Sequence, residues 1–137
     1  MNYDIHKAAG IIIKDRKLLI ERSYGKDTFM APGGKLEAGE TPRDALIREL
    51  KEEFQLEIWD QDITEFGTFY AEAAGSHNKG KQIRMDVFMV QKFGNVGRDN
   101  EVEEIRWITS DVPKDIQLGS IFAHEVVPRL KAQNLID

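Results

Sequence analysis

Three glutamates lie close together in the stretch RELKEEF, namely Glu49, Glu52 and Glu53. In a helix, residues three and four positions apart share one face, so these carboxylates would fall within an arc of roughly 100°. Mg²⁺ takes about six oxygen ligands near 2.1 Å and usually binds a few carboxylates together with water and substrate phosphate. The spacing therefore indicates a helix face that could hold a divalent cation.

A solvated helix face is the simpler interpretation of the same stretch. Arg48 and Lys51 stand among the glutamates. They reduce a repulsion that amounts to a few tenths of a kcal/mol per pair on a bare surface. RELKEEF alone does not separate a metal site from an exposed helix, so the residues around it have to decide.

The helix that would carry these glutamates is predicted over Pro42–Phe54. Thr41 suits the N-cap, Pro42 suits the first helical position, and Asp44 lies in the first turn. Beside the glutamates on a helical wheel lies an apolar arc that would face the core. Its members are Leu46, Ile47, Leu50 and Phe54.

Apolar stretches on either side of this helix predict strands. Two of them, around Ala8–Ile13 and Leu18–Arg22, are expected to form a hairpin through the turn Lys14–Lys17. TEFGTFYAEAA and VEEIRWIT have strand composition, and a turn is predicted at Ser76–Lys81. Alternation in QIRMDVFMVQKF places four apolar side chains on one face: Ile83, Met85, Val87 and Met89.

The chain is expected to close with the helix SIFAHEVVPRLKAQNLI, which Pro128 should kink or split. Phe122, Val126 and Leu130 are spaced to form its apolar stripe. Strands on both sides of helices in this order predict an α/β or α+β sandwich with a mixed sheet.

Composition limits the classes of protein. The 137 residues fit a single domain, 1–137, with 41% hydrophobic and 31% charged residues. The chain has no cysteine, which excludes disulfides and zinc–thiolate sites and suits a cytoplasmic protein. No apolar run reaches the roughly 20 residues of a membrane span, and MNYDIHKAAG lacks a signal-peptide pattern. A net charge of -5 argues against polynucleotide binding but permits a small phosphorylated ligand bound with metal.

The stretch from Gly34 to Leu56 resembles the Nudix box, G-x5-E-x7-R-E-U-x-E-E-x-G-U, in which U is an aliphatic residue. It departs from this pattern at Gln55, where the family has glycine. The lead-in PGGK and the later stretch EIRWI also look like the family. So long a motif favours the metal site over the solvated helix. The matching positions are Gly34, Glu40, Arg48, Glu49, Leu50, Glu52, Glu53 and Leu56.

The departure at Gln55 can be weighed physically. The glycine that it replaces ends the helix in a left-handed conformation. A non-glycine residue there costs about 1 kcal/mol but removes no ligand. We therefore expect a small change in local geometry and almost none in the chemistry.

The resemblance implies roles for the residues of the box. Divalent metal would be bound, Mg²⁺ or alternatively Mn²⁺, and Arg48 would pair with Glu40 to orient the carboxylates. Gly34 would give structural support beside the carboxylates. The implied metal ligands are Gly33, through its carbonyl, with Glu49, Glu52 and Glu53.

The proton from the attacking water goes, in this family, either to a glutamate of the box or to an acid on a later loop. Glu53 represents the first choice, and Glu101 is favoured for the second because Glu103 and Glu104 abut a strand. Asp99 is the fourth later candidate, and solvated surface charge is the alternative for all four. The implied catalytic residues are Arg48, Glu49, Glu53 and Glu101.

Substrate contacts are less evident from the sequence. Lys35 and Arg22 could meet phosphates, although both could also be surface cations. Arg84 and Asp86 share a strand face and could read polar edges of a ligand. The aromatic residues that could stack on a base, or instead lie in the core, are Tyr24, Phe29, Phe69, Tyr70 and Trp107. The predicted substrate-binding residues are Arg22, Phe29, Lys35 and Arg84.

The resemblance implies a Nudix-type α/β/α sandwich and a cytoplasmic, MutT-like, Mg²⁺-dependent pyrophosphohydrolase. Its substrate would be a nucleoside diphosphate derivative, foremost a (deoxy)nucleoside triphosphate cleaved to monophosphate and pyrophosphate. Dinucleoside polyphosphates and nucleotide sugars are alternative substrates, and a Nudix-fold binding domain without turnover is the alternative class. The expected partner is a small nucleotide, with no polynucleotide and no membrane, and a homodimer is left open.

Overall fold

The computed structural model of the chain describes residues 2–73, 79–91, 93–98 and 101–137. Its helical elements are α1 (Pro42–Phe54), the 3-10 helix η1 (Asp60–Asp62), the π-helical segment η3 (Phe122–Val126) and α2 (Val127–Ala132). Its strands are β1 (Ile5–Ile11), β2 (Ile13–Lys14), β3 (Lys17–Ser23), β4 (Thr28–Phe29), β5 (Gly33–Lys35), β6 (Ile63–Glu72), β7 (Gln82–Val90), β8 (Val102–Ile108) and β9 (Gln117–Leu118).

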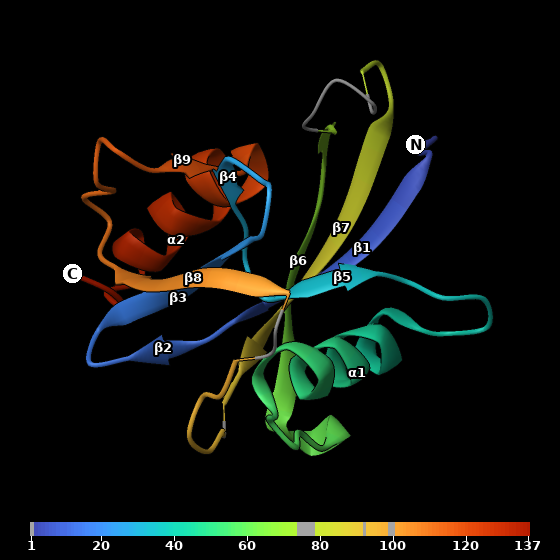
Figure 1. The fold of residues 1–137 in the computed structure, drawn as a ribbon, viewed down its shortest axis with the longest axis horizontal. Coiled ribbons are helices and arrows are strands. Elements are labelled where there is room, and N and C mark those ends of the chain that lie inside the picture. Colours follow the sequence, from blue (N-terminus) through green and yellow to red (C-terminus); the bar gives the residue numbers. More distant parts are fainter. Residues whose placement is uncertain (1, 74–78, 92, 99–100) are drawn as a thin grey trace.

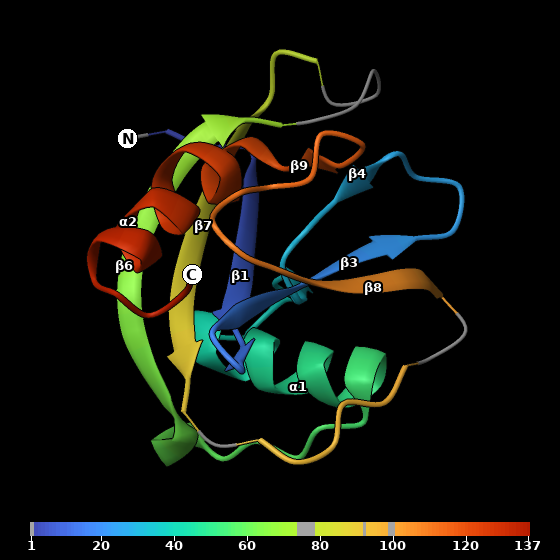
Figure 2. The same cartoon turned by 90° about the vertical axis from the view of Figure 1, so that its left-hand side faces the viewer.

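A four-stranded sheet in the order β5-β1-β7-β6 forms the centre of the fold. β1 and β7 are parallel, whereas β5 with β1 and β6 with β7 are antiparallel, so the sheet is mixed as predicted. Residues of α1 pack against one face of this sheet, and residues of η3 and α2 pack against the other. Figures 1 and 2 show the helices on opposite sides of the strands, which confirms the predicted α/β/α arrangement.

The predicted hairpin forms, but its strands are β2 and β3. Ile13 lies opposite Leu18, and Asp15 and Arg16 make the turn with positive φ angles. The stretch predicted as one strand, Ala8–Ile13, is divided, because β1 belongs to the central sheet and β2 to a second sheet of order β2-β3-β8. The two sheets diverge after β1 (Figure 1).

The helix α1 begins and ends at the predicted residues. The Thr41 side chain accepts a hydrogen bond from the Asp44 N–H (3.1 Å), and the Asp44 carboxylate accepts one from the Thr41 N–H (3.2 Å). This capping box satisfies two donors that a helix start otherwise leaves open. Gln55 follows the helix in the predicted left-handed conformation, with φ 53° and ψ 34°.

The closing helical segment is divided near Pro128, as predicted. It runs as a π-helix over Phe122–Val126 and becomes α2 at Val127. Proline cannot donate a hydrogen bond to the carbonyl one turn earlier, which accounts for a change of helix type at this point. The predicted turn at Ser76–Lys81 lies partly outside the described residues. Among the described residues, no helix has both the length and the apolar composition needed to span a membrane.

Candidate active site

The glycine pair Gly33 and Gly34 lies on β5, the edge strand of the central sheet. β5 pairs with β1 so that Gly33 stands opposite Ala9 and Gly34 opposite Ala8. A Cβ atom on Gly34 would lie 2.7 Å from the carboxyl group of Glu49, and one on Gly33 would lie 2.1 Å from the Ala8 carbonyl oxygen. Glycine is therefore required at Gly33, where φ is 140° and the contact is with backbone, whereas a side chain at Gly34 would displace the Glu49 carboxyl group.

Glu53 extends from α1 past this strand. Its Oε1 accepts a hydrogen bond from the Gly33 N–H (3.1 Å). Its carboxyl group is also hydrogen-bonded to the side chain of Glu21 on β3. Burial, and next the charge of Glu21, raise the pKa of Glu53 far above its ordinary value. Two buried carboxyl groups in contact need either a shared proton or a cation between them.

Glu21 is a site residue that the sequence analysis missed. It continues the buried run Leu18, Leu19 and Ile20, and only 5% of its surface is exposed. The available signal was the acidic side chain at the end of an apolar strand. Acidic residues are almost never fully buried unless they are paired or have a function.

Arg48 orients the carboxylates nearest to β5. It donates from Nε and from one terminal nitrogen to the two oxygens of Glu40 (2.7 and 2.9 Å), and from the other terminal nitrogen to Glu49 (2.8 Å). The hydrogen bonds from Arg48, then that from the Glu37 backbone, lower the pKa of Glu40 to about 2. Arg48 also donates to the Lys35 carbonyl (3.1 Å), which attaches β5 to the helix. This is the Arg48–Glu40 pairing that the resemblance implied.

Glu52 points away from the other two glutamates. Its side chain is 57% exposed, and its carboxylate lies 3.3 Å from Arg48. In the described ranges, no three acidic or histidine side chains already form a metal cage. The structure therefore brings Glu49 and Glu53 to β5, together with Glu21, and leaves the predicted ligand Glu52 at the surface.

The residues at β5 suit a divalent cation on chemical grounds. Glu21, Glu49 and Glu53 offer only carboxylate oxygens, which favour Mg²⁺ or Mn²⁺ over softer metals. Burial raises the pKa of Glu49, although the neighbouring Arg48 opposes this effect. Burial, and next the negative charge of Glu21, raise the pKa of Glu53. Both shifts mean that the surrounding groups do not fully compensate the negative charge of the ionised carboxylates. A bound cation would supply the missing positive charge. Gly34 leaves the space for the Glu49 carboxyl group against the strand.

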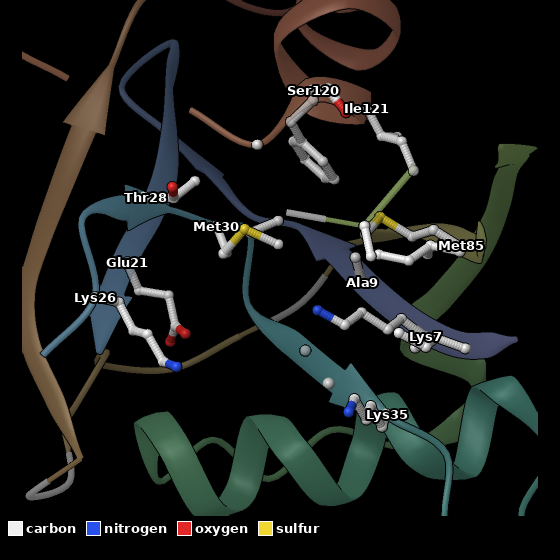
Figure 3. A pocket seen from close by; sticks show the side chains of 18 of the residues that line it. Lys7, Ala9, Glu21, Lys26, Thr28, Met30, Lys35, Met85, Ser120 and Ile121 are labelled. Carbon is white, nitrogen blue, oxygen red and sulfur yellow. The ribbon is translucent and has the colours of Figure 1, made fainter. Parts of the chain in front are cut away.

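A cavity of about 730 Å³ opens beside these carboxylates, between the central sheet and β3 (Figure 3). Lys7 on β1 and Lys35 on β5 point into it from neighbouring strands. Its volume is in the range of small-molecule sites. Away from β5 the lining includes the apolar residues Ala71, Ile83, Met85, Ile121 and Phe122, together with the polar residues Glu72, Gln117 and Ser120.

Arg22 was predicted to contact phosphate, but the structure directs it away from the cavity. Its guanidinium donates to Glu103 (2.6 Å) and Glu104 (3.3 Å) and lies over the Phe29 ring. Successive residues of a strand point to opposite faces. Because the Glu21 side chain faces the cavity, the side chain of its neighbour Arg22 faces away from it. The residue of β3 at the cavity is therefore Glu21 and not the predicted Arg22.

Two other predicted substrate-binding residues also lie elsewhere. Phe29 is 5% exposed and belongs to the hydrophobic core. Arg84 lies on the other face of the central sheet, where it pairs with Asp86. Within the described part of the chain, the aromatic side chain at the cavity is Phe122, which was not among the stacking candidates. Lys35 is the predicted substrate-binding residue that does line the cavity.

The predicted later acids have mixed positions. Asp99 lies outside the described residues. Glu101 is exposed just before β8, and its carbonyl accepts a hydrogen bond from the Tyr24 N–H (3.1 Å). Glu103 and Glu104 are ion-paired with Arg22. None of the three described acids lines the cavity, whereas Glu53 does.

Comparison with protein families gives a match to the NUDIX domain over residues 4–130. A MutT-like protein of Streptomyces ambofaciens is 30% identical over 124 residues, which cover 89% of this chain and 74% of that protein. Two shorter matches concern proteins named for their substrates. An 8-oxo-dGTP diphosphatase of Haemophilus influenzae is 41% identical over 66 residues, 44% of this chain and 48% of that protein. An ADP-ribose pyrophosphatase of Methanocaldococcus jannaschii is 53% identical over 47 residues, 32% of this chain and 28% of that protein.

Among solved structures, a MutT structure from work on Aliivibrio salmonicida and Vibrio cholerae resembles the whole fold. The TM-score is 0.70 and the identity 26%, with 94% of this chain and 98% of that chain covered. Similarity over nearly the full length of both chains includes both sheets and both helical layers described above.

Proposed function

This chain belongs to the NUDIX domain family, and we propose that it is a pyrophosphohydrolase that cleaves a diphosphate linkage in a small nucleotide. The substrate best supported is a (deoxy)nucleoside triphosphate, with monophosphate and pyrophosphate as products. The observation that carries the proposal is the cavity itself. It joins Glu53 and Glu21 at one end with three lysines, Lys7, Lys26 and Lys35, and with an apolar surface at the other end.

Glu49 and Glu53 are the residues that would hold a divalent cation, Mg²⁺ or Mn²⁺, with Glu21 beside them. When bound, the cation would neutralise phosphate charge and lower the pKa of a water molecule. Arg48 holds Glu49 in place through its hydrogen bond of 2.8 Å. The predicted ligands Glu52 and the Gly33 carbonyl remain part of the proposal, and Glu52 could join them by a change of side-chain rotamer.

In the proposed reaction, water attacks one phosphorus of the diphosphate linkage, and the bond from that phosphorus to the bridging oxygen breaks. A carboxylate takes the proton from water, and the bridging oxygen leaves with the other phosphate. Glu53 is the proposed proton acceptor, because it lines the cavity and hydrogen-bonds to the strand that borders it. Lys35 would bind phosphate oxygens from the edge strand.

The choice of substrate is supported by relatives and by the shape of the site. The match to an 8-oxo-dGTP diphosphatase favours a nucleoside triphosphate. The match to an ADP-ribose pyrophosphatase supports a nucleotide sugar as the second candidate. The apolar end of the cavity can accept a base or another apolar group in either case. We also propose a cytoplasmic location, in keeping with a nucleotide substrate.

The proposal is tested by incubating the protein with Mg²⁺ and with a panel of substrates, and by measuring product masses. The panel contains ordinary and oxidised nucleoside triphosphates, nucleotide sugars and dinucleoside polyphosphates. Monophosphate and pyrophosphate should form from a triphosphate, and EDTA or Glu53→Gln should stop their formation. Release of inorganic phosphate with diphosphate left behind would reject this chemistry, and binding without any product would indicate a ligand-binding domain.

A further inference from the structure

Lys7 lies in the middle of the central sheet, on the side that borders the cavity. It stands opposite Lys35 on β5 and opposite Met85 on β7. Figure 3 shows the Lys7 side chain extending from β1 into the cavity, with Glu21 on the β3 side. Its neighbour His6 pairs with Asp86 on the other face of the sheet, and the residues that follow it, Ala8 and Ala9, are buried. Lys7 is therefore the charged side chain that β1 directs toward the cavity.

Within the described ranges, the ammonium group of Lys7 forms neither a hydrogen bond nor an ion pair. Three arginines that are also partly buried, Arg22, Arg48 and Arg84, each contact at least one carboxylate. Burial, and next the charge of Lys35, lower the pKa of Lys7, although the acids near β5 oppose this effect. A partly buried cation without a partner destabilises a fold, so packing does not account for the lysine.

The order of the strands places Lys7 between the two ends of the cavity. β5, at one edge, adjoins Glu49 and Glu53, whereas β7 and β6 carry the apolar residues Met85 and Ala71. β1 lies between β5 and β7. A nucleotide with its diphosphate linkage at the carboxylates and its organic part on the apolar surface would therefore cross β1. The group that passes over β1 is the phosphate attached to the organic part.

We propose that Lys7 binds the phosphate that carries the nucleoside, or the equivalent organic group, of the substrate. Its ammonium group donates hydrogen bonds to the non-bridging oxygens of that phosphate and supplies the counter-charge. The inference rests on the proposed function for the orientation of the substrate. It gives Lys7 the role that the sequence suggested for Arg22, from a different strand.

The test is isothermal titration of the protein with four nucleoside monophosphates, dGMP, AMP, UMP and CMP, and with the matching nucleosides. The variants are Lys7→Met, which keeps the length of the side chain without its charge, and Lys7→Arg. The matched control is Lys17→Met, which removes an exposed lysine from β3. Lys7→Met should weaken binding of the preferred monophosphate by about 10- to 100-fold, as expected for a charged hydrogen bond.

The matching nucleoside should bind Lys7→Met and wild type equally, because it lacks the phosphate. Lys7→Arg should recover part of the lost affinity, and Lys17→Met should bind as wild type does. Three results would each overturn the assignment: monophosphate affinity within threefold of wild type in Lys7→Met, an equal loss for the nucleoside, or no monophosphate binding by wild type.

Thermal unfolding without ligand separates this role from a structural one. Lys7→Met should unfold at the same or a higher temperature than wild type, since it removes an unpaired cation from a partly buried site. A clear fall in the unfolding temperature would mean that Lys7 supports the fold, against the proposal. If the wild type hydrolyses nothing in the panel but Lys7→Met selectively loses monophosphate binding, the proposed reaction fails while the assignment of Lys7 stands.

Discussion

The central sheet carries a polar cluster on each face, and the two clusters differ in how their charges are satisfied. The network cluster consists of His6, Thr68, Arg84 and Asp86. Asp86 receives hydrogen bonds from Thr68 (2.7 Å) and Arg84 (3.4 Å) and lies 2.5 Å from the His6 ring nitrogen. Burial alone would raise the pKa of Asp86, but hydrogen bonds from His6, Thr68 and Arg84 hold it below its ordinary value.

The cavity cluster consists of Lys7, Glu21, Lys35 and Glu53 on the other side of β1. Here burial raises the pKa of Glu53 and lowers that of Lys7. Both shifts favour the neutral forms, whereas the shift of Asp86 favours its charged form. The network cluster stabilises its own charges and so supports the fold. The cavity cluster leaves its charges insufficiently compensated and is therefore suited to bind charged ligands. His6 and Lys7 are adjacent in β1, and successive side chains of a strand point to opposite faces of the sheet. The two clusters therefore lie on opposite faces.

The largest effect is expected from Glu53→Gln in the cavity cluster. Turnover should fall by at least ~100-fold, since loss of a ligand should exceed the roughly 10- to 100-fold typical of supporting residues. The fold should be as stable as wild type in EDTA, because one of two buried carboxyl groups in contact has been made neutral. Steady-state kinetics and urea unfolding measure the two effects. Glu57→Gln, at an exposed position, is the control, and near-normal turnover in Glu53→Gln under limiting Mg²⁺ would refute the assignment.

The opposite pattern is expected from Asp86→Asn in the network cluster. Asparagine replaces one accepting oxygen by a donating NH2 group and removes the negative charge. The change should destabilise the fold by about 2 kcal/mol, because charged hydrogen bonds are lost and the groups that pointed at the carboxylate keep their positions. Turnover should change by less than about threefold, since Asp86 faces away from the cavity. Urea unfolding and the substrate assay measure both, with the exposed Asp111→Asn as control. If Asp86→Asn unfolded at the same urea concentration as wild type, the network cluster would not contribute to the stability of the fold.

A dependence on pH should distinguish the network cluster further. Asp86 has a lower pKa in the folded chain than in the unfolded chain, where it is near 3.8. Its contribution to stability is therefore fully present above that pH and is lost as the pH falls through the folded value. From pH 5 to pH 3, wild type should therefore lose more stability than Asp86→Asn. Asp86 lines a second, smaller hollow together with Arg43 and Glu65, so Glu65→Gln should be measured alongside. Parallel pH profiles for wild type and Asp86→Asn would contradict the prediction.

The smallest effect is expected at Gln55, which belongs to neither cluster. Gln55→Gly should stabilise the fold by up to ~1 kcal/mol, because glycine adopts the left-handed conformation without strain. Turnover should stay within a few-fold of wild type. The Gln55 side chain lies against Gly97, where a Cβ atom would be 1.8 Å from Gln55 Oε1. A loss of stability in urea would mean that this contact outweighs the backbone strain.

The outcome at Gln55 and α1 shows where local reasoning succeeds. The helix limits, the Thr41–Asp44 capping box and the left-handed residue after Phe54 depend on interactions within a few positions of the chain. The alternating face of β7 was equally legible, because Ile83, Met85 and Val87 all enter the same core. Such features need only the helical or strand period and the chemistry of caps.

The positions of Arg22 and Glu21 show where local reasoning fails. Both lie in the predicted strand, and a shift of one residue exchanges the side chain that faces the cavity. The direction is set by the pairing of β3 with β8 and by the Glu21–Met30 bridge, which involve residues far apart in the sequence. Sequence pattern alone gave no reason to prefer the acid over the arginine.

By itself, the sequence determined the family motif, the helix that carries Glu49 and Glu53, and the class of mixed α+β fold, because these follow from spacing and periodicity. Only the tertiary structure decided that the predicted strand Ala8–Ile13 divides between two sheets and that the glycine pair forms an edge strand. It also decided that Lys7 and Glu21 border the same cavity as Glu53. Those outcomes depend on which strands pair. Strand pairing depends on burying both faces of the sheet at once, so no short stretch of the chain contains that information.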